Sequence, residues 1–390
     1  MSKQQFERKT KGDKPVLAIC YDFDKTLSPD DMQAQGFIQS LNLDVADFWK
    51  ASNGLAESND MDQNLAYMYM MREESSGAVV FTKTNLEEYG SKVALFPGVE
   101  SWFERINQFG EEHGVLVEHY IISSGLKEMI EGTSIAKKGV FEKIYASSFY
   151  CDKKGVAVWP SQVVNYTNKT QFLFRIEKGV LDINDQGVND YFAPEDIRVP
   201  FRNMVYIGDS DTDIPCMKLV NSYGGHSIGV YNCETNEKAK VYKMMRDNRI
   251  KYFAPTDYSE NTELDKLVKA IIAKTAANEQ LEAIHYNCKK ENIEADKKSN
   301  EAEQRKTALI MRLENSASFA TTHSIVKELQ NVSRWMQEEK EWLYNIALHN
   351  SQVLCILGDS DVSKFYSKLI KNTKNLSDNA QKIKNMIGYK

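Results

Sequence analysis

An unbroken apolar run, Val-Leu-Ala-Ile-Cys-Tyr at residues 16–21, ends directly at two nearby carboxylates, Asp22 and Asp24. The run has no polar alternation, which predicts a strand buried on both faces, as in a parallel sheet covered by helices. Ligands of such sheets bind outside the carboxyl ends of the strands. If the extended chain continues past Tyr21, the side chains of Asp22 and Asp24 point the same way and can flank one reacting atom. The sequence therefore predicts a chemical site at this strand end.

Short acidic motifs also occur by chance, and the alternative is a strand that ends in an Asx-type turn and caps the next helix. Two acids at such a position are costly unless a cation or a proton compensates them. Two further apolar runs also end in polar groups and favour the chemical site, because their hydroxyls and carboxylates supply the hard oxygen ligands that Mg²⁺ prefers. They are residues 115–125, which end in Ser123, Ser124 and Gly125, and residues 201–214, which contain Asp209, Asp211 and Asp213.

Taken together, these three segments resemble the motifs of the haloacid dehalogenase (HAD) superfamily of phosphohydrolases, in particular its phosphoserine-phosphatase-like branch. The resemblance covers about residues 14–255. The first family motif, hhhhDxDxT, is matched by Cys20 to Thr26, and the second, a strand ending in Ser or Thr, by IISSG with Ser123 as the aligned residue. The fourth, hhhGDxxxD, is matched through Gly208, Asp209 and Asp213.

The third motif of the family is a single lysine and has little specificity. We choose Lys169, because it opens an apparent helix upstream of the fourth motif. Three other lysines remain alternatives, namely Lys153, Lys154 and Lys178.

The resemblance implies a role for each matched residue. Asp22 would be the nucleophile that forms an aspartyl-phosphate, and Asp24 the acid and base for the leaving group and the water. Thr26 would position the Asp24 side chain or the backbone of its loop. The second acid favours ester hydrolysis over halide displacement, since a halide leaves without a proton.

The resemblance also implies how phosphate and metal are held. The phosphoryl oxygens would be bound by Ser123, Ser124, Gly125 and Lys169. Mg²⁺ would be held by the carboxylates of Asp22 and Asp209 and by the backbone carbonyl of Asp24. Asp213 would orient the lysine or the waters of the metal, whereas Asp211 has no clear role.

These observations predict an α/β fold with a Rossmann-like, doubly wound parallel sheet, a helical cap and an all-helical C-terminal part. The expected domains are a polar lead-in at residues 1–14, a catalytic core at 15–30 and 95–258, a cap at 31–94 and a helical region at 259–390. A cap that closes over the site favours a small phosphorylated metabolite as the substrate. Five cap residues, Tyr67 to Met71, could face this substrate, although helix packing accounts for such a cluster more often.

Composition narrows the class of protein further. The net charge is −6 with both signs interspersed, so the sequence does not favour nucleic acid or an anionic membrane as a partner. It has no stretch of about 18 or more apolar residues, and the first residues lack the apolar segment of a signal peptide. Six cysteines are scattered without C-x-x-C pairs, which predicts a reduced, cytoplasmic protein.

The helical region after residue 256 is not explained by the resemblance. It contains no proline and two glycines, and apolar residues recur at helical spacing, including the exposed-looking Trp335 and Trp342. A second Gly-Asp-Ser-Asp at residues 358–361 lacks the later acid of the fourth motif, so we interpret it as a break between two helices. We expect this region to mediate homo-oligomerisation or to bind a protein partner. The alternative to an enzyme is then an interaction protein whose HAD-like domain is an accessory phosphatase or a sensor.

Overall fold

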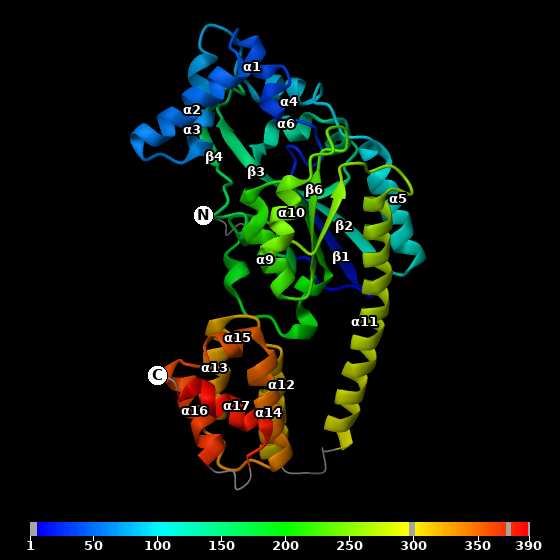
Figure 1. Ribbon diagram of the computed structural model, residues 1–390, viewed down its shortest axis with the longest axis vertical. Helices are drawn as coiled ribbons and strands as arrows, with labels where there is room; N and C mark the ends of the chain where they lie inside the picture. The colour runs from blue at the N-terminus through cyan, green and yellow to red at the C-terminus, as the bar shows by residue number, and fades with distance from the viewer. Residues whose placement is uncertain (1–5, 296–300, 372–375, 389–390) are drawn as a thin grey trace. The chain divides into compact units, whose positions relative to one another are not determined.

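The apolar run at residues 16–21 forms strand β1 (Val16–Tyr21), which lies at the centre of the sheet. In the computed structural model, which describes residues 6–295, 301–371 and 376–388, seven strands form one sheet in the order β4-β3-β2-β1-β5-β6-β7 (Figure 1). The first five residues of the expected lead-in lie outside the described residues. The other strands are β2 (Leu116–Leu126), β3 (Phe141–Cys151), β4 (Ala157–Gln162), β5 (Met204–Gly208), β6 (His226–Tyr231) and β7 (Tyr252–Pro255).

Strand β1 is buried on both faces, as the unbroken apolar run predicts. Alternate residues belong to two separate apolar cores, with Leu17, Ile19 and Tyr21 in one and Ala18 and Cys20 in the other. Side chains of helices on both sides complete these cores. The first core takes residues from α5 (Val99–Glu112) and α11 (Glu263–Ala295), and the second from α8 (Thr170–Lys178), α9 (Ile214–Ser222) and α10 (Ala239–Arg246).

The sheet is parallel except at one edge. Strand β1 pairs in parallel with β2 and β5, and Tyr21 lies opposite Ile121 and Ile207 in these neighbours. The carboxyl ends of the three strands that carry the polar motifs therefore meet at the same edge of the sheet. Strand β4 is antiparallel to β3 and forms a hairpin. The prediction of a doubly wound, mostly parallel sheet is confirmed.

The insertion between β1 and β2 is helical. Aspartates begin its two longest helices, because Asp44 and Asp62 each accept hydrogen bonds from two backbone N–H groups of the first turn. Of the five cap residues singled out above, Tyr67, Met68 and Met71 are buried in the first core and Tyr69 is exposed. The elements are a 3₁₀ turn η1 (Met32–Ala34) and helices α1 (Phe37–Ser40), α2 (Val45–Asn59), α3 (Gln63–Glu74) and α4 (Lys83–Gly90), followed after β2 by α6 (Lys127–Gly132) and α7 (Ser134–Lys137).

The long connection from α8 to β5 is held by two buried arginines. The guanidinium of Arg175 donates to the carbonyls of Asp182, Ile183 and Asp185. Arg198 forms a buried bidentate ion pair with Glu118 of β2. Arg175 satisfies carbonyls of this irregular segment that would otherwise lack partners, and Arg198 joins the end of the segment to β2.

The chain does not leave the core when the sheet ends at β7. The hydroxyl of Tyr258, which is fully buried, donates to the carbonyl of Thr26 at 2.9 Å, and its backbone N–H donates to Pro97. In the first half of α11, Leu264 and Val268 are buried in the same core as β1. The chain forms two compact units, and the boundary between them lies within α11. Unit 1 comprises Met1–Val188 and Ile197–Glu279, and unit 2 comprises Asn189–Asp196 and Gln280–Lys390.

Unit 2 is helical, as predicted, and has an apolar core of its own. Trp335 and Trp342, which look exposed from the sequence, are partly buried and pack against this core. The second Gly-Asp-Ser-Asp begins a helix at Ser360, and Asp361 accepts a hydrogen bond from His323 at 2.8 Å. The helices are α12 (Glu301–Glu314), α13 (Phe319–Leu329), α14 (Gln337–His349), α15 (Ser351–Cys355), α16 (Ser360–Lys371) and α17 (Asp378–Ile387). Among the described helices, none has the length and apolar character needed to cross a membrane.

One buried acid on α8 gives a stability prediction. Burial raises the pKa of Glu177 from 4.5 to about 7. The contribution of Glu177 to stability is therefore fully present below pH 4.5 and is lost as the pH rises through 7. Glu177→Gln should raise the free energy of unfolding by about 1–3 kcal/mol at pH 8 and leave it unchanged at pH 4.

Urea unfolding at the two pH values measures this difference. Glu57→Gln on the exposed face of α2 is the matched control, because it removes the same charge from water. Equal urea midpoints for wild type and Glu177→Gln at pH 8 would show that Glu177 is ionised in the folded protein without cost.

Candidate active site

Asp22 follows β1 directly and is fixed beside the end of β5. Its backbone N–H donates to the carbonyl of Ile207 at 2.9 Å, which extends the strand pairing by one residue. The regular strand nevertheless ends at Tyr21, and Lys25 adopts a left-handed conformation (φ 56°). Asp22 and Asp24 therefore lie beyond the regular strand, so the condition for a shared strand face, a strand that continues past Tyr21, is not met.

Three of the predicted acids come together at the edge of the sheet. Carboxylate oxygens of Asp22, Asp209 and Asp213 lie within 4.8 Å of one another. Asp209 follows β5 directly, and Asp213 ends the 3₁₀ turn η5 (Asp211–Asp213). Asp211 is exposed and lies outside this cluster, which we call the acidic cluster.

Of the four candidate lysines, the structure brings Lys169 to the acidic cluster. Lys169 precedes α8 and is fully buried, and its Nζ lies 2.7 Å from Asp213 Oδ1 and 3.2 Å from Asp22 Oδ1. Burial alone would lower the pKa of Lys169, but the charges of Asp213 and Asp22 raise it overall. The ammonium therefore stays protonated. The other lysines lie elsewhere, with Lys153 and Lys154 exposed in the hairpin turn and Lys178 donating to the carbonyl of Val188.

The carboxylate of Asp213 is saturated with hydrogen bonds. Oδ1 accepts from Lys169 and from the hydroxyl of Tyr206 at 2.9 Å. Oδ2 accepts from the backbone N–H and the hydroxyl of Ser210, at 3.2 and 3.0 Å. Gly208 is required here, because a Cβ on it would lie 2.5 Å from Asp213 Oδ2. Asp213 is thus held toward the lysine by four donors.

Asp24 lies outside the acidic cluster. Its Oδ1 accepts a hydrogen bond from the backbone N–H of Met32 at 2.8 Å, in the first turn of the helical insertion. Its Oδ2 lies against Gly125, where an added Cβ would approach it to 2.9 Å. Burial, reinforced by the charges of Asp31 and Asp22, raises the pKa of Asp24 well above its ordinary value. A carboxyl in this position favours the protonated form.

The hydroxyls of the first two motifs are buried beside these acids. Ser123 Oγ accepts a hydrogen bond from the N–H of Gly125 at 3.0 Å. The hydroxyls of Thr26 and Ser124 are buried and lack a hydrogen-bond partner among the described residues. Thr26 therefore does not hold the side chain of Asp24, and the backbone of Met32 does so instead.

Sequence reasoning missed Tyr206 at this site, and it named Tyr67 only as one of five cap residues that could face the substrate. Tyr206 lies on β5 and bonds to Asp213. Tyr67 of α3 donates from its hydroxyl to the carbonyl of Ser124 at 2.7 Å, which brings the helical insertion onto the second motif. A hydroxyl-bearing ring within an otherwise apolar strand was the available signal for Tyr206. Nothing in the sequence separated Tyr67 from its four neighbours, because its helical spacing is also that of a core residue.

The acidic cluster fits a divalent cation. Burial, together with repulsion from Asp213, raises the pKa of Asp22 to about 7, although Lys169 opposes the rise. Burial also raises the pKa of Asp209 to about 6. Three carboxylates face one buried ammonium, so negative charge is in excess, and Asp22 Oδ1 is a buried acceptor without a hydrogen bond. Hard oxygen donors in this arrangement suit Mg²⁺.

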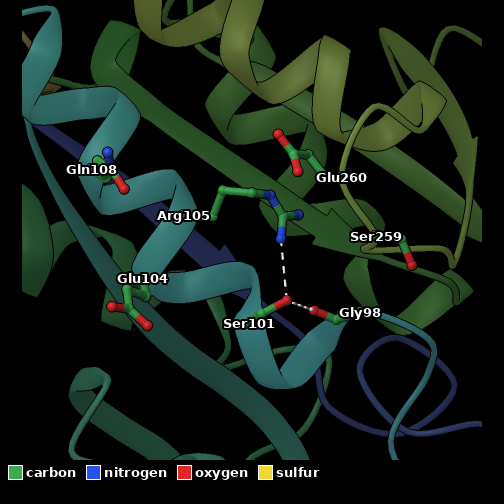
Figure 2. A pocket seen from close by; sticks show the side chains of 7 residues that line it. All are labelled: Gly98, Ser101, Glu104, Arg105, Gln108, Ser259 and Glu260. Carbon is green, nitrogen blue, oxygen red and sulfur yellow. Dashed lines mark hydrogen bonds between the residues drawn. The ribbon is translucent and has the colours of Figure 1, made fainter.

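A groove elsewhere in unit 1 does not share residues with this site. In Figure 2 the side chain of Arg105 lies in this groove and donates to Ser101 Oγ at 3.2 Å. It also donates to the carbonyl of Tyr258 and pairs with the buried Asp265. The groove therefore belongs to the packing of the segment before α11, and we assign it no catalytic role. Its lining residues are Gly98, Ser101, Glu104, Arg105, Gln108, Ser259 and Glu260.

Comparison with known proteins gives distant similarities. No family model matches the chain. An uncharacterized protein of Borreliella burgdorferi is 26% identical over 274 residues, which are 64% of this chain and 94% of that protein.

Among solved structures, a HAD family hydrolase of Salmonella enterica serovar Typhi covers 67% of this chain and 73% of its own, with 16% identity and a TM-score of 0.44. A phosphoserine phosphatase, determined as a phospho-aspartyl intermediate analogue, covers 66% and 99%, with 15% identity and a TM-score of 0.40. Cytosolic 5'-nucleotidase IIIB bound to cytidine covers 67% and 86%, with 14% identity and a TM-score of 0.40. At these TM-scores the similarities carry no assignment of function to this chain.

Proposed function

We propose that the protein is a magnesium-dependent phosphohydrolase of the HAD superfamily, similar to the phosphoserine-phosphatase branch, which cleaves a small phosphomonoester through an aspartyl-phosphate. One observation supports this above all. Two carboxylates that are two residues apart have different surroundings, with Asp22 against a buried lysine and Asp24 held apart with a raised pKa. One acid can therefore attack as a carboxylate while the other carries a proton.

The proposed reaction has two steps. The carboxylate of Asp22 attacks phosphorus, and the bond from phosphorus to the ester oxygen breaks as Asp24 gives its proton to that oxygen. In the second step Asp24 takes a proton from water, whose oxygen attacks phosphorus and releases Asp22. Lys169 would bind the phosphoryl oxygens together with Ser123, Ser124 and Gly125, and its protonated ammonium opposes the charge that develops on them.

The metal would be held by the carboxylates of Asp22 and Asp209 and by the backbone carbonyl of Asp24. It would neutralise the excess negative charge of the acidic cluster and so allow Asp22 to remain ionised at neutral pH. Asp213 would act on Lys169, since four donors already occupy its carboxylate.

The substrate would be a small phosphorylated metabolite of the cytoplasm. This part of the proposal rests on the helical insertion, which reaches the second motif through Tyr67, and on the burial of the hydroxyls of Ser124 and Thr26. A macromolecular phosphate ester would need the insertion to move aside. The assay that tests the proposed function is hydrolysis of a panel of phosphomonoesters by the purified chain with Mg²⁺. Absence of turnover with every phosphomonoester, including activated aryl phosphates, would instead support the alternative of an interaction protein.

The role of Asp24 predicts a dependence on the leaving group. Asp24→Asn should reduce kcat by roughly 10²–10⁴-fold for an alkyl phosphate, whose oxygen needs a proton. The loss should be much smaller for a nitrophenyl phosphate, whose leaving group is stable as an anion. Steady-state rates of both substrates with both proteins measure this. An equal loss for the two substrates would contradict the assignment of Asp24 as the acid.

A further inference from the structure

Tyr206 is a buried residue of the site that the reaction above does not use. It lies on β5, and its side chain is fully buried next to the acidic cluster. Its hydroxyl donates to Asp213 Oδ1 at 2.9 Å, the same oxygen that accepts from Lys169 Nζ at 2.7 Å. The phenol and the ammonium thus share one acceptor atom.

This shared oxygen decides where the ammonium lies. Lys169 Nζ is placed between two carboxylates, 2.7 Å from Asp213 and 3.2 Å from Asp22, and the contact with Asp22 is not a hydrogen bond. If Asp213 rotated, the ammonium could move toward Asp22 and pair with the nucleophile. Ser210 donates two hydrogen bonds to the other oxygen of Asp213, and Tyr206 donates one to Oδ1.

We propose that Tyr206 is a positioning residue for phosphoryl transfer, which fixes Asp213 and through it keeps Lys169 directed at the phosphoryl oxygens. The inference rests on the proposed function. The proposed effect is specific to the lysine, because the hydroxyl of Tyr206 is hydrogen-bonded to Asp213 and to neither Asp22 nor Asp209. Tyr206→Phe keeps the buried ring and removes the hydroxyl alone.

The expected result is a change in kcat without a change in binding. Tyr206→Phe should lower kcat for an aryl phosphate about tenfold, because the lysine acts on charge that develops in the transition state. KM and the Mg²⁺ concentration for half-maximal activity should stay within about twofold of wild type, since the metal ligands are untouched. A loss of folding would instead reduce the active fraction of enzyme, which active-site titration and the melting temperature detect.

Tyr145→Phe is the matched control. Tyr145 lies on β3, is fully buried, and donates from its hydroxyl to the carbonyl of Leu181. The Tyr145→Phe variant therefore loses one hydrogen bond of a buried tyrosine hydroxyl, as Tyr206→Phe does, but away from the acidic cluster. Its kcat should equal that of wild type.

A double-mutant cycle separates positioning from general packing. In an Asp213→Asn background, Tyr206→Phe should cause no further loss of kcat, because its partner is already altered. Unchanged kcat in Tyr206→Phe, or a further tenfold loss in the Asp213→Asn background, would overturn the inference. If the variant melts near the assay temperature, the same comparison is made below its melting temperature. A failure of this inference is distinct from a failure of the proposed function. The proposed function would be disproved only if Asp22→Asn remained active.

Discussion

Replacing Asp22 with Asn should abolish turnover of an aryl phosphate, with a loss of kcat of at least about 10³-fold. The amide cannot form the acyl-phosphate bond, and no other carboxylate of the acidic cluster is free to replace it. Asp213 is held by four donors, and Asp209 would bind the metal. The measurement is a steady-state rate together with the mass of the acid-quenched protein, which in wild type should carry one phosphoryl group.

The fold should survive this substitution. The pKa of Asp22 is raised to about 7, so burial already disfavours its charged form and an uncharged amide removes that cost. We expect a melting temperature equal to or above that of wild type. Asp211→Asn is the matched control, because Asp211 is exposed and outside the acidic cluster. Full activity in Asp22→Asn, with wild-type activity in the control, would rule out the aspartyl-phosphate.

Removing divalent cations should eliminate activity, and adding Mg²⁺ should restore it. Without a metal ion, the carboxylates of Asp22, Asp209 and Asp213 have only Lys169 and the more exposed Lys240 as counter-charges, and the pKa of Asp22 is then near neutrality. Part of the nucleophile would be protonated, and the phosphate dianion would be repelled. Ca²⁺ should inhibit, since it prefers more ligands at longer distances. Rates in excess chelator, before and after Mg²⁺ is added, test this.

Asp209→Asn should raise the Mg²⁺ concentration for half-maximal activity by roughly 10–100-fold. Melting curves give a second readout, because Mg²⁺ that binds the folded state should raise the melting temperature of wild type and not of Asp209→Asn. Asp211→Asn should respond to Mg²⁺ as wild type does. Undiminished turnover in excess chelator would refute the metal site.

Much of the fold follows from patterns that depend on local sequence. The unbroken run at residues 16–21 requires burial on both faces, and the structure gives β1 a core on each side. Polar groups at the ends of apolar runs come to the same edge of a sheet only if the strands are parallel neighbours. The structure shows this arrangement for β1, β2 and β5. The absence of proline after residue 256 correctly indicates helices.

The features that could not be predicted depend on contacts between distant residues. Asp24 lies outside the acidic cluster because the strand ends at Tyr21 and the carboxylate of Asp24 accepts a hydrogen bond from Met32, which is distant in sequence. The pairing of Tyr206 with Asp213 needs the position of η5 relative to β5, which no spacing rule supplies. Trp335 and Trp342 have the helical spacing of surface and core residues alike, and only the packing of unit 2 shows that they are partly buried against its core.

The central position of β1 has a consequence for how this chain folds during synthesis. The strand is the first to be made, yet its neighbours begin at Leu116 and Met204, so it cannot pair until much later parts of the chain exist. Loops of this length make folding slow, and an unpaired apolar strand is prone to associate with other chains in the meantime. We therefore expect the nascent chain to depend on chaperones until β5 has been made, and amino-terminal fragments that end before β5 to aggregate.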